Sequence, residues 1–457
     1  MTSEGTRYDT IIVGTGPGGA TVARELARAS QRVLILEWGG REPVTANFGQ
    51  ALRELFMPGR SFLITPDLMG VARGITTGGS SIYYCGTAFE PSYEMFDKYG
   101  VDLRDEIAEV RAELPIGPLE PRLIGPKSQR IMESARAIGL DWKPLDKFLY
   151  QDRCESSEPM GFYCAPSYES KWNARMWIDE AVAAGAILQT GARVHKVLFE
   201  SKTATGVVYT QAGRTVRADA DNIVLAAGGL GSPMILRESG IRGAGYNFFV
   251  DPLIFALGEL DELEGPGELP MSTGIHCDED GYMLTDFFLP RALDVATALQ
   301  VGRFGKVRPR ASARTLGIMI KARDVLAGRL SKRGGIRRRL MPVDAAKLEH
   351  GYGRAHAVLA QAGARKIYRT GTIAAHPGGT AKLGELVDEN LRTEFSNLYV
   401  CDCSVVPEPF GRPPTLTLMG FGKRLARHLV GAEDRSQRTV SAVAAAGGGS
   451  AFRLAPR

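Results

Sequence analysis

The pattern of apolar and polar positions in the first forty residues predicts a strand, a helix and a second strand, in that order. Asp9 to Val13 is a short apolar run, Pro17 to Ala29 has the spacing of an amphipathic helix, and Val33 to Leu36 is again apolar. A strand, a crossover helix and a strand joined this closely form a β-α-β unit. We therefore expect the chain to begin with a parallel sheet.

Further along, helical and strand-like patterns alternate, and no internal repeat is visible. Amphipathic spacing predicts helices at Leu103 to Leu114, Lys127 to Ile138, Trp172 to Ala184, Val343 to Gln361 and Thr415 to Val430. Strands are predicted at Val194 to Phe199, Gly206 to Thr210 and Asn222 to Ala226, and the stretch from Phe255 to Lys321 is mostly strand-like.

Composition adds a size and a compartment to this picture. With 457 residues, of which 44% are hydrophobic, the chain can bury the cores of about two closely joined domains. The start is polar and no run of eighteen apolar residues occurs, so we expect neither a signal peptide nor a membrane span. We therefore expect a cytoplasmic location.

Six cysteines are too few for a disulfide framework and suggest no metal site. Residues 433–457 are rich in Ala, Gly and Ser, and we expect a disordered tail.

Charge is concentrated in one segment, although the net charge is only +5. Residues 303–339 contain thirteen Lys and Arg against one acid, Asp324. A solvated surface is the first interpretation, followed by contact with an anionic membrane surface or an acidic electron-acceptor protein. No aromatic residues are interleaved with these cations, so nucleic acid ranks last, and peripheral attachment to a membrane stays open beside the cytoplasmic location.

The loop between the first strand and helix carries a glycine pattern typical of dinucleotide binding. Gly14, Gly16 and Gly19 supply G-x-G-x-x-G, with Pro17 and Gly18 between them. Such glycines allow a tight turn, a close backbone approach to pyrophosphate and close helix packing, in that order. Glu37 ends the second strand, where a carboxylate can accept hydrogen bonds from a ribose diol. The pattern predicts a dinucleotide site without choosing between NAD and FAD.

Four separated segments together resemble one enzyme family. They are the N-terminal glycine pattern, Arg73 to Ser81 (RGITTGGSS), Gly228 to Pro233 (GGLGSP) and the stretch from His376 to His428, which includes HPGGTAKLG and NLYVCDCSVVPEPFGRPPTLT. Read together, they resemble the glucose-methanol-choline family of FAD-dependent oxidoreductases. The last segment is the most specific of the four.

The resemblance implies an α/β fold in which a Rossmann-like FAD-binding domain is joined to a discontinuous α+β substrate domain built on an antiparallel sheet. We assign 1–90, 190–245 and 373–432 to the FAD-binding domain, and 91–189 and 246–372 to the substrate-binding domain. It also implies cofactor contacts at Gly78, Gly79, Ser80, Val194, Ala227, Asp402, Pro414 and Thr415. For Asp402 a cap at the end of a strand is the alternative. Some members of the family attach the flavin covalently through a histidine near the Gly-Gly-Ser turn, but the first histidine of this chain is His195. We therefore expect noncovalent FAD, with Tyr83, Tyr84 and Cys85 as the alternative points of attachment.

The same resemblance implies that His376 faces flavin N5 and accepts the hydroxyl proton of a substrate as hydride leaves the carbon. Imidazole suits this task because its pKa lies near 6.5. The family's second catalytic position, usually His or Asn, falls on Pro413, which has no side-chain donor or acceptor. His376 therefore acts alone or recruits Arg412 or a polar side chain of the substrate domain. Arg412 could equally bind a substrate carboxylate or reach solvent.

These features predict an FAD-dependent enzyme that oxidises the CH–OH group of a small alcohol, as a dehydrogenase rather than a sugar oxidase. The electron acceptor, whether oxygen, a quinone or a protein, stays open. Two alternatives also stay open because Pro413 departs from the family pattern. One is different flavin chemistry, such as desaturation or reduction, and the other is an electron-relay flavoprotein that docks through its basic segment.

Overall fold

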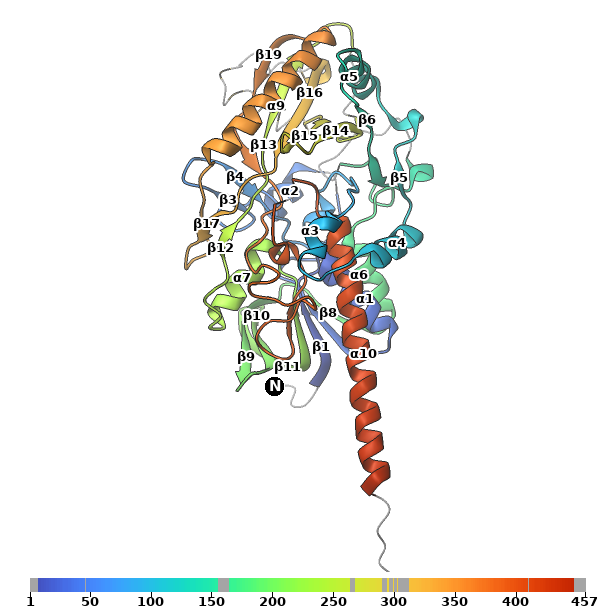
Figure 1. Cartoon of the computed structure of the whole chain (residues 1–457), viewed down its shortest axis with the longest axis vertical. Helices are drawn as coiled ribbons and strands as arrows, with labels where there is room; N and C mark the ends of the chain where they lie inside the picture. The colour runs from blue at the N-terminus through green and yellow to red at the C-terminus, as the bar shows by residue number, and fades with distance from the viewer. Residues whose placement is uncertain are drawn as a thin grey trace, which may run out of the picture.

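The fold was determined as a computed structural model of the whole chain. It describes residues 7–45, 47–154, 164–263, 268–289, 312–409 and 411–447, with four single positions between 294 and 302, and the main chain alone from 432 onward. Two sheets lie toward opposite ends of the molecule, and α10 (Thr415–Gly447) runs along its side and projects past the first sheet (Figure 1).

Seven strands among the described residues form the first sheet, in the order β8-β2-β1-β11-β10-β9 with β21 beside β11. They are β1 (Arg7–Val13), β2 (Val33–Leu36), β8 (Ile187–Gln189), β9 (Arg193–Glu200), β10 (Thr203–Gln211), β11 (Arg214–Leu225) and β21 (Leu398–Val400). The pairs around β1, β2, β8, β11 and β21 are parallel, and β9 and β10 are added as antiparallel hairpins. The predicted N-terminal parallel unit is confirmed.

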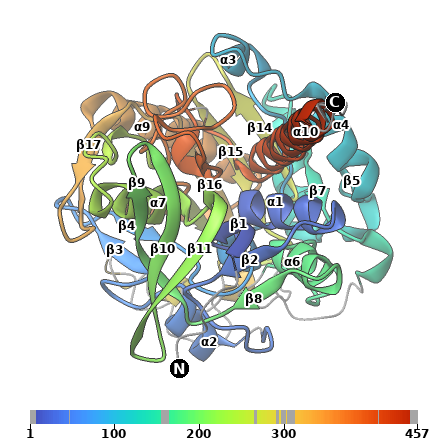
Figure 2. The same cartoon turned by 90° about the horizontal axis from the view of Figure 1, so that it is seen from below.

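Helices cover the parallel part of this sheet because its strands are apolar on both faces. All four residues of β2 are buried, and Ile11 and Ile12 of β1 are fully buried. α1 (Pro17–Arg28) packs against both α6 (Ala174–Ala183) and α10, and α4 (Arg104–Glu113) packs on α10. Figure 2 shows α1, α6 and α10 on one side of the sheet, with α7 (Gly228–Glu238) on the side of β9 and β10.

The second sheet has nine strands among the described residues, in the order β3-β4-β20-β13-β16-β15-β14-β6 with β19 beside β13. They are β3 (Phe62–Ile64), β4 (Gly70–Ala72), β6 (Lys143–Pro144), β13 (Pro252–Glu259), β14 (Thr273–Cys277), β15 (Tyr282–Asp286), β16 (Thr315–Ala322), β19 (Arg365–Arg369) and β20 (Ile373–Ala374). Apart from β4 with β20, the pairs are antiparallel. The predicted antiparallel sheet is therefore present.

Side-chain alternation divides this sheet into two different faces. Ile254 and Ala256 on β13 lie opposite Ile320 and Ile318 on β16, and these residues pack with α9 (Pro342–Gln361) and α5 (Pro126–Ala137). The intervening positions, such as Phe255 opposite Met319, face the other way. That second face looks away from α9.

Smaller elements complete the described structure. β12 (Tyr246–Phe248), β17 (Ala327–Leu330) and β18 (Ile336–Arg337) form a three-stranded sheet, and β5 (Ile116–Pro118) pairs with β7 (Asp146–Phe148). Two short helices are α2 (Phe48–Glu54) and α3 (Tyr93–Asp97). Short 3-10 turns include η1 (Gly79–Ile82) and η6 (Cys403–Val405).

Two expectations differ from the structure. Helix α10 continues to Gly447, where the sequence analysis expects a disordered tail from residue 433, and the Ala, Arg, Glu and Gln residues of 433–447 are good helix formers. Residues 448–457 lie outside the described part. The sheets also cross the assigned domain boundaries, because β3, β4 and β20 join the second sheet while β8 joins the first.

Candidate active site

The glycine loop after β1 has the geometry of a phosphate-binding turn. Gly14 has φ of +104°, and a Cβ there would lie 2.3 Å from the carbonyl oxygen of Ala226. A Cβ at Gly19 would lie 2.4 Å from the oxygen of Gly14. At Gly16, by contrast, a Cβ would meet no protein atom within 4 Å. Packing explains the first two glycines, whereas the open space at Gly16 is what a bound pyrophosphate would need.

The start of α1 also has amide groups to offer. The first hydrogen bond of the helix runs from Ala20 N to the oxygen of Gly16. The amides of Gly18 and Gly19 come before Ala20 in the chain and have no acceptor within the helix. Together with the helix dipole they form a site suited to an anion.

Thr15 joins the three predicted cofactor segments, and sequence reasoning did not single it out. Its hydroxyl donates to Glu37 Oε2 at 2.5 Å and accepts from Gly78 N at 2.9 Å. The other oxygen of Glu37 accepts from Gly39 N at 2.7 Å. Burial raises the pKa of Glu37, and these donors partly oppose the rise. The acid is therefore held at the end of β2 with lone pairs left for a ribose.

The remaining N-terminal candidates lie around this network. A Cβ at Gly79 would come within 3.3 Å of Gly16 Cα, so the two glycine turns face each other. Ser80 Oγ accepts from Gly74 N at 2.9 Å and closes the second turn. Val194 is buried near the start of β9, and the amide of Ala192, two residues before it, donates to the oxygen of Glu37 at 2.8 Å. The structure thus brings these residues together.

Two alanine substitutions separate cofactor binding from folding at this loop. We expect Gly16→Ala to change the free energy of unfolding of the flavin-free protein by less than about 0.5 kcal/mol. It should weaken FAD binding by about tenfold or more, because the methyl group fills the cofactor's space. Gly18→Ala is the matched control, since its Cβ would lie 2.2 Å from the oxygen of Cys401. We expect that change to destabilise the fold by about 3 kcal/mol. Urea unfolding and flavin titration measure the two effects, and equal stability losses would contradict the assignment.

Asp402 occupies the centre of a second polar network. Its Oδ2 accepts from Gly228 N at 2.8 Å and from Ser232 Oγ at 2.5 Å, and its Oδ1 accepts from Ser404 N at 2.8 Å. The side chain therefore caps η6 and holds the start of α7, which is the cap considered as the alternative. Ala227, the N-cap residue of α7, donates its amide to Ser232 Oγ at 3.0 Å. A Cβ at Gly228, whose φ is +78°, would meet no atom within 4 Å, so space is left in front of this network.

The segment around His376 packs onto the same edge of the first sheet. A Cβ at Gly229 would lie 1.8 Å from the oxygen of Pro377, and Thr380 Oγ1 donates to the oxygen of Gly229 at 2.7 Å. Gly379 N donates to the oxygen of Cys403, just beyond β21. His376 is thus carried to the carboxyl ends of the parallel strands, where open α/β sheets bind ligands.

His376 forms a cluster with two buried charged residues that the sequence analysis did not name. Its Nδ1 lies 3.1 Å from Asp251 Oδ2 and 3.4 Å from Lys321 Nζ, and Lys321 Nζ lies 3.4 Å from the same oxygen. The side chains of Asp251 and Lys321 are each 1% exposed, and that of His376 is 28% exposed. Because a carboxylate only accepts, Nδ1–H donates to Asp251, and Nε2 carries the free lone pair.

The charges in this cluster act on the imidazole in opposite directions. Burial lowers the pKa of His376, the positive charge of Lys321 lowers it further, and the hydrogen bond and charge of Asp251 raise it. The pKa of Lys321 is itself lowered by burial and raised by Asp251. The net effect is a neutral imidazole at pH 7, which is the form that can accept a proton.

Both members of the Asp251–His376 pair have left-handed backbones, which are costly for residues other than glycine. Their φ values are +46° and +50°, and such conformations persist only where the surroundings enforce them. Asp324 accepts from Val250 N at 3.0 Å and from Asp251 N at 3.4 Å. Arg338, which is fully buried, donates to Asp324 at 2.5 Å. Burial and the charge of Asp251 raise the pKa of Asp324 to about 7, against the effect of Arg338.

These contacts correct the interpretation of the basic segment as one surface. Lys321 and Arg338 are buried and bonded to acids within the protein. Alternating apolar neighbours in β16 draw Lys321 into the interior, where Asp251 compensates its charge. Residues 303–311 of the segment lie outside the described part. A basic surface can therefore be formed only by the cations of this segment other than Lys321 and Arg338.

Arg412 and Pro413 lie beside the second sheet. Arg412 Nη2 donates to both oxygens of Asp278, at 3.0 and 3.1 Å, and its Nε lies 3.4 Å from His276 Nε2. Among the described residues, no hydrogen bond or ion pair joins Arg412 to His376. Pro413 and Pro414 are buried, and the oxygen of Pro414 accepts from Leu418 N at the start of α10, which begins at Thr415. Arg412 is thus neutralised by Asp278, and it neither binds His376 nor simply reaches solvent.

His276 and Lys321 share one cross-strand row of the second sheet. His276 lies opposite Met283, and Met283 lies opposite Lys321. Two strand spacings separate His276 from Lys321, which is about 10 Å. Burial and the charge of Arg412 lower the pKa of His276 to about 4, so this second imidazole is neutral.

Apolar side chains dominate the rest of this face. The buried cluster consists of Leu253, Phe255, Leu257, Met271, Met283, Met319 and Tyr368, with Cys85, Phe89 and Ala375 packed against it. Cys85 follows the second glycine turn and Ala375 precedes His376. The cluster therefore lies between the predicted cofactor turn and the histidine. A mostly apolar wall with a few polar groups is typical of small-molecule sites.

Two further searches of the described residues concern metal binding and membrane spans. No group of three or more His, Cys, Asp or Glu side chains among them could hold a metal ion. None of the described helices combines the length and apolar composition that a membrane span requires.

Comparison with known proteins places this geometry in a family. The N-terminal model of the GMC oxidoreductases matches residues 8–253, and the C-terminal model matches 308–422. An uncharacterized protein of Methanocaldococcus jannaschii is 25% identical over 426 residues, covering 93% of this chain and all of its own. A long-chain-alcohol oxidase of Arabidopsis thaliana is 22% identical over 503 residues, covering 92% of this chain and 68% of its own.

A solved structure supports the same assignment at the level of the fold. The structure of a formate oxidase of Aspergillus oryzae, described for its FAD modification, superposes with a TM-score of 0.73 at 15% identity and covers 95% of this chain and all of its own. The predicted fold class is confirmed. The chain belongs to the GMC oxidoreductase family, whose members are FAD-binding flavoproteins.

Proposed function

We propose that this protein oxidises the CH–OH group of an apolar alcohol, with His376 accepting the hydroxyl proton. Noncovalently bound FAD supplies the hydride acceptor. The substrate then loses a proton to Nε2 of His376 and a hydride from carbon, and it leaves as a carbonyl compound. Gly16, Glu37, Gly78 and the start of α1 would hold the cofactor.

The orientation of His376 carries this proposal. Asp251 occupies Nδ1 at 3.1 Å, so the ring presents Nε2 as an acceptor on its partly exposed side. A general base needs this tautomer and a neutral state near pH 7. As the proton arrives, Asp251 and the developing imidazolium form a charge-assisted pair. Lys321 balances the charge of Asp251 before the reaction.

The departure at Pro413 fits this arrangement. The second residue of the family would assist the substrate oxygen, and no polar group replaces its side chain at that position. His276 is one polar candidate on the same sheet face, because it shares the row of Lys321. Asp251 and Lys321 compensate for the missing side chain at position 413 in a different way. They orient and tune His376 as a single base and do not supply a second polar group to the substrate oxygen.

The apolar wall supports the choice of substrate. Leu253, Phe255, Met283 and Met319 offer no partners for the several hydroxyls of a sugar, and an unpaired buried hydroxyl is costly. An alkyl or aromatic alcohol would instead bury its carbon atoms there. The long-chain-alcohol oxidase found among the relatives acts on a substrate of that kind, as its name states.

Anaerobic flavin reduction tests the reaction directly. We expect primary alcohols with long alkyl or aromatic groups to bleach the flavin absorbance, and glucose or choline to leave it unchanged. Reoxidation by oxygen or by a dye then distinguishes an oxidase from a dehydrogenase, and we expect the dye to be faster. Bleaching by none of the alcohols, together with reduction by a saturated ketone or acid, would favour desaturation on the same scaffold.

Lys321→Met should move the pH profile without removing the base. Lys321 lowers the pKa of His376, so its loss should raise that pKa. A base works only when unprotonated, and the acid limb of kcat/KM should therefore shift to higher pH. In the wild type this limb should lie below the usual imidazole pKa of about 6.5. Stopped-flow flavin reduction across pH measures both, and a shift to lower pH would contradict the assigned contacts.

A further inference from the structure

The hairpin of β17 and β18 presents arginines on one face and apolar side chains on the other. Leu330 lies opposite Ile336, and both are buried in a cluster with Met69, Val71 and Phe248. Arg329 lies opposite Arg337 on the outer face, and both are exposed. Lys332 and Arg333 in the connecting turn and Arg339 after β18 are also exposed.

These five cations make no ion pair within the described part of the protein, although Arg339 lies near enough to Asp67 to lower the pKa of that acid. By contrast, the buried Arg338 between them forms ion pairs with two acids. Like charges placed directly opposite on neighbouring strands destabilise a hairpin. Arg329 and Arg337 are therefore not explained by the stability of the fold. An external anionic partner would explain both.

Exposed apolar side chains lie beside the cations. Leu68, at the tip of the β3–β4 hairpin, is 82% exposed, Ile64 is 57% exposed and Val343 is 48% exposed. Met341 and Ile373 are also exposed. A single exposed leucine is ordinary, but five large apolar residues from three neighbouring segments form an unusual surface.

Several contacts join the two groups into one face. Asp67 Oδ2 accepts a hydrogen bond from Leu340 N at 2.6 Å, and the charge of Arg339 contributes to the lowered pKa of Asp67. These contacts place the Leu68 tip beside residues 339–341. Ile373 pairs with Gly70 of β4. Residues of β4, β17, β18 and β20 share the same buried cluster. Both overall views place β3, β4 and β17 on the same side of the molecule (Figures 1 and 2).

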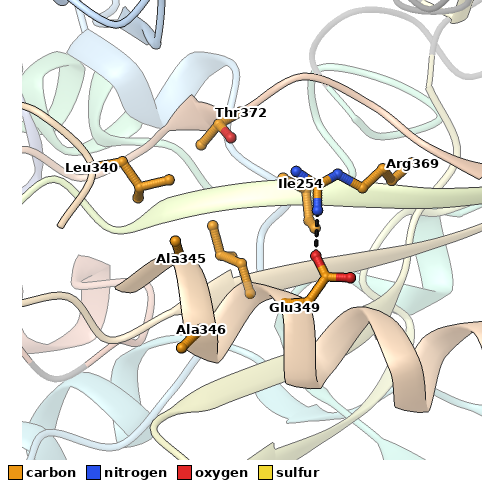
Figure 3. Close-up of a pocket in the computed structure, with 8 residues that line it drawn as sticks. Ile254, Leu340, Ala345, Ala346, Glu349, Arg369 and Thr372 are labelled. Carbon is orange, nitrogen blue, oxygen red and sulfur yellow. Dashed lines mark hydrogen bonds and ion pairs between the residues drawn. The ribbon is translucent and has the colours of Figure 1, made fainter. Parts of the chain in front are cut away.

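The face also contains a hollow. A cavity of about 300 Å³ opens between α9 and the second sheet, lined by Ile254, Leu340, Leu348 and Thr372 among others (Figure 3). Glu349 and Arg369, which form an ion pair, are also part of its lining. Leu340 and Thr372 are the chain neighbours of the exposed Met341 and Ile373. The cavity lies on the α9 face of the sheet, away from His376, and its lining combines apolar side chains with this ion pair.

We propose that this face, formed by Ile64, Leu68, Met341, Val343 and Ile373 with the cations of residues 329–339, docks the protein on an anionic lipid bilayer. Apolar side chains enter the boundary between headgroups and acyl chains, and the surrounding arginines and lysine meet lipid phosphates. An acidic protein partner would match the cations equally well. It would not require Leu68 to stand free at the end of a hairpin, whereas a bilayer accepts such a side chain without a complementary pocket.

Docking at this face would bring the active site close to the lipid. Ile373 precedes His376 by three residues, a span of at most about 10 Å along the chain. An apolar alcohol dissolved in the bilayer would then lie near the base that the proposed function assigns. The docking itself does not depend on that function, since vesicle binding is measured without turnover.

Sedimentation of the flavin-loaded full chain with vesicles tests the proposal. We expect binding to vesicles of phosphatidylcholine mixed with phosphatidylserine, weaker binding to phosphatidylcholine alone, and a decline as salt increases. Leu68→Asp should reduce the bound fraction at a given lipid concentration by about tenfold. Lys332→Glu combined with Arg333→Glu should reduce it by about tenfold or more.

Matched controls lie on the first sheet. Ile187, on β8, is 47% exposed, so Ile187→Asp makes the same kind of change as Leu68→Asp at another face. Lys202→Glu with Arg214→Glu changes the net charge as much as the turn variant, and both residues are exposed. These controls should bind like the wild type. The proposal is overturned if phosphatidylserine vesicles bind no better than phosphatidylcholine, or if controls and docking variants lose binding equally. In the first case an acidic protein becomes the better partner for the cations.

Discussion

His376→Asn is expected to lower kcat for alcohol oxidation by about 10²–10⁴-fold while the flavin stays bound. Asparagine has no group that can accept the hydroxyl proton near pH 7. It also tolerates the left-handed backbone of residue 376, where φ is +50°, better than most residues. The variant should therefore keep the fold and lose only the base. Rapid-mixing measurement of flavin reduction by the alcohol checks the rate, and the visible spectrum checks the cofactor.

The flavin content makes this result interpretable. Residue 376 lies between β20 and the glycine turn that packs on α7, so a misfolded variant would lose FAD as well as activity. A variant that holds flavin and still turns over near the wild-type rate would show that another group removes the proton. The electron-relay alternative would then gain support, because it needs no base at position 376.

Asp251→Asn is expected to lower kcat by about 10²–10⁴-fold, in line with Asp-to-Asn changes behind catalytic histidines in other enzymes. The side-chain amide can donate to Nδ1, which would turn the imidazole over to the tautomer with a proton on Nε2. That tautomer cannot act as a base. Asparagine also fits the φ of +46° at this position. KM for the alcohol should change little, because Asp251 does not line the exposed side of the ring.

Two further measurements distinguish positioning from a structural role of Asp251. Since Asp251 raises the pKa of His376, its loss should shift the remaining activity toward lower pH, opposite to Lys321→Met. Asp280→Asn is the matched control, since Asp280 pairs with Arg354 at 2.9 Å on the side of α9. If Asp251→Asn and Asp280→Asn reduce kcat equally, or if the pH limb does not move, Asp251 does not orient the base.

Most of the first sheet could be predicted from local patterns. The buried runs of β1 and β2 and the glycines between them depend only on neighbours in the chain, and the structure has them where the pattern indicates. Thr15 could have been noticed, because a hydroxyl inside such a loop is well placed to bond an acid at the end of the next strand. Lys321 also left a signal, since it interrupts the apolar strand TLGIMIKA. Asp251 left none, because its neighbours along the chain do not reveal the histidine 125 residues away.

By itself the sequence determined the β-α-β start and the family, and it named the glycine loop as the candidate dinucleotide site and His376 as the candidate base. Each of these depends on short segments whose residue types have a local physical reason. Only the tertiary structure decided which nitrogen of His376 is free, that Arg412 is neutralised by Asp278, and that Lys321 and Arg338 lie inside the protein rather than on its surface. Those outcomes depend on contacts between strands far apart in the chain, where burial and a neighbouring charge set the role of an ionisable group.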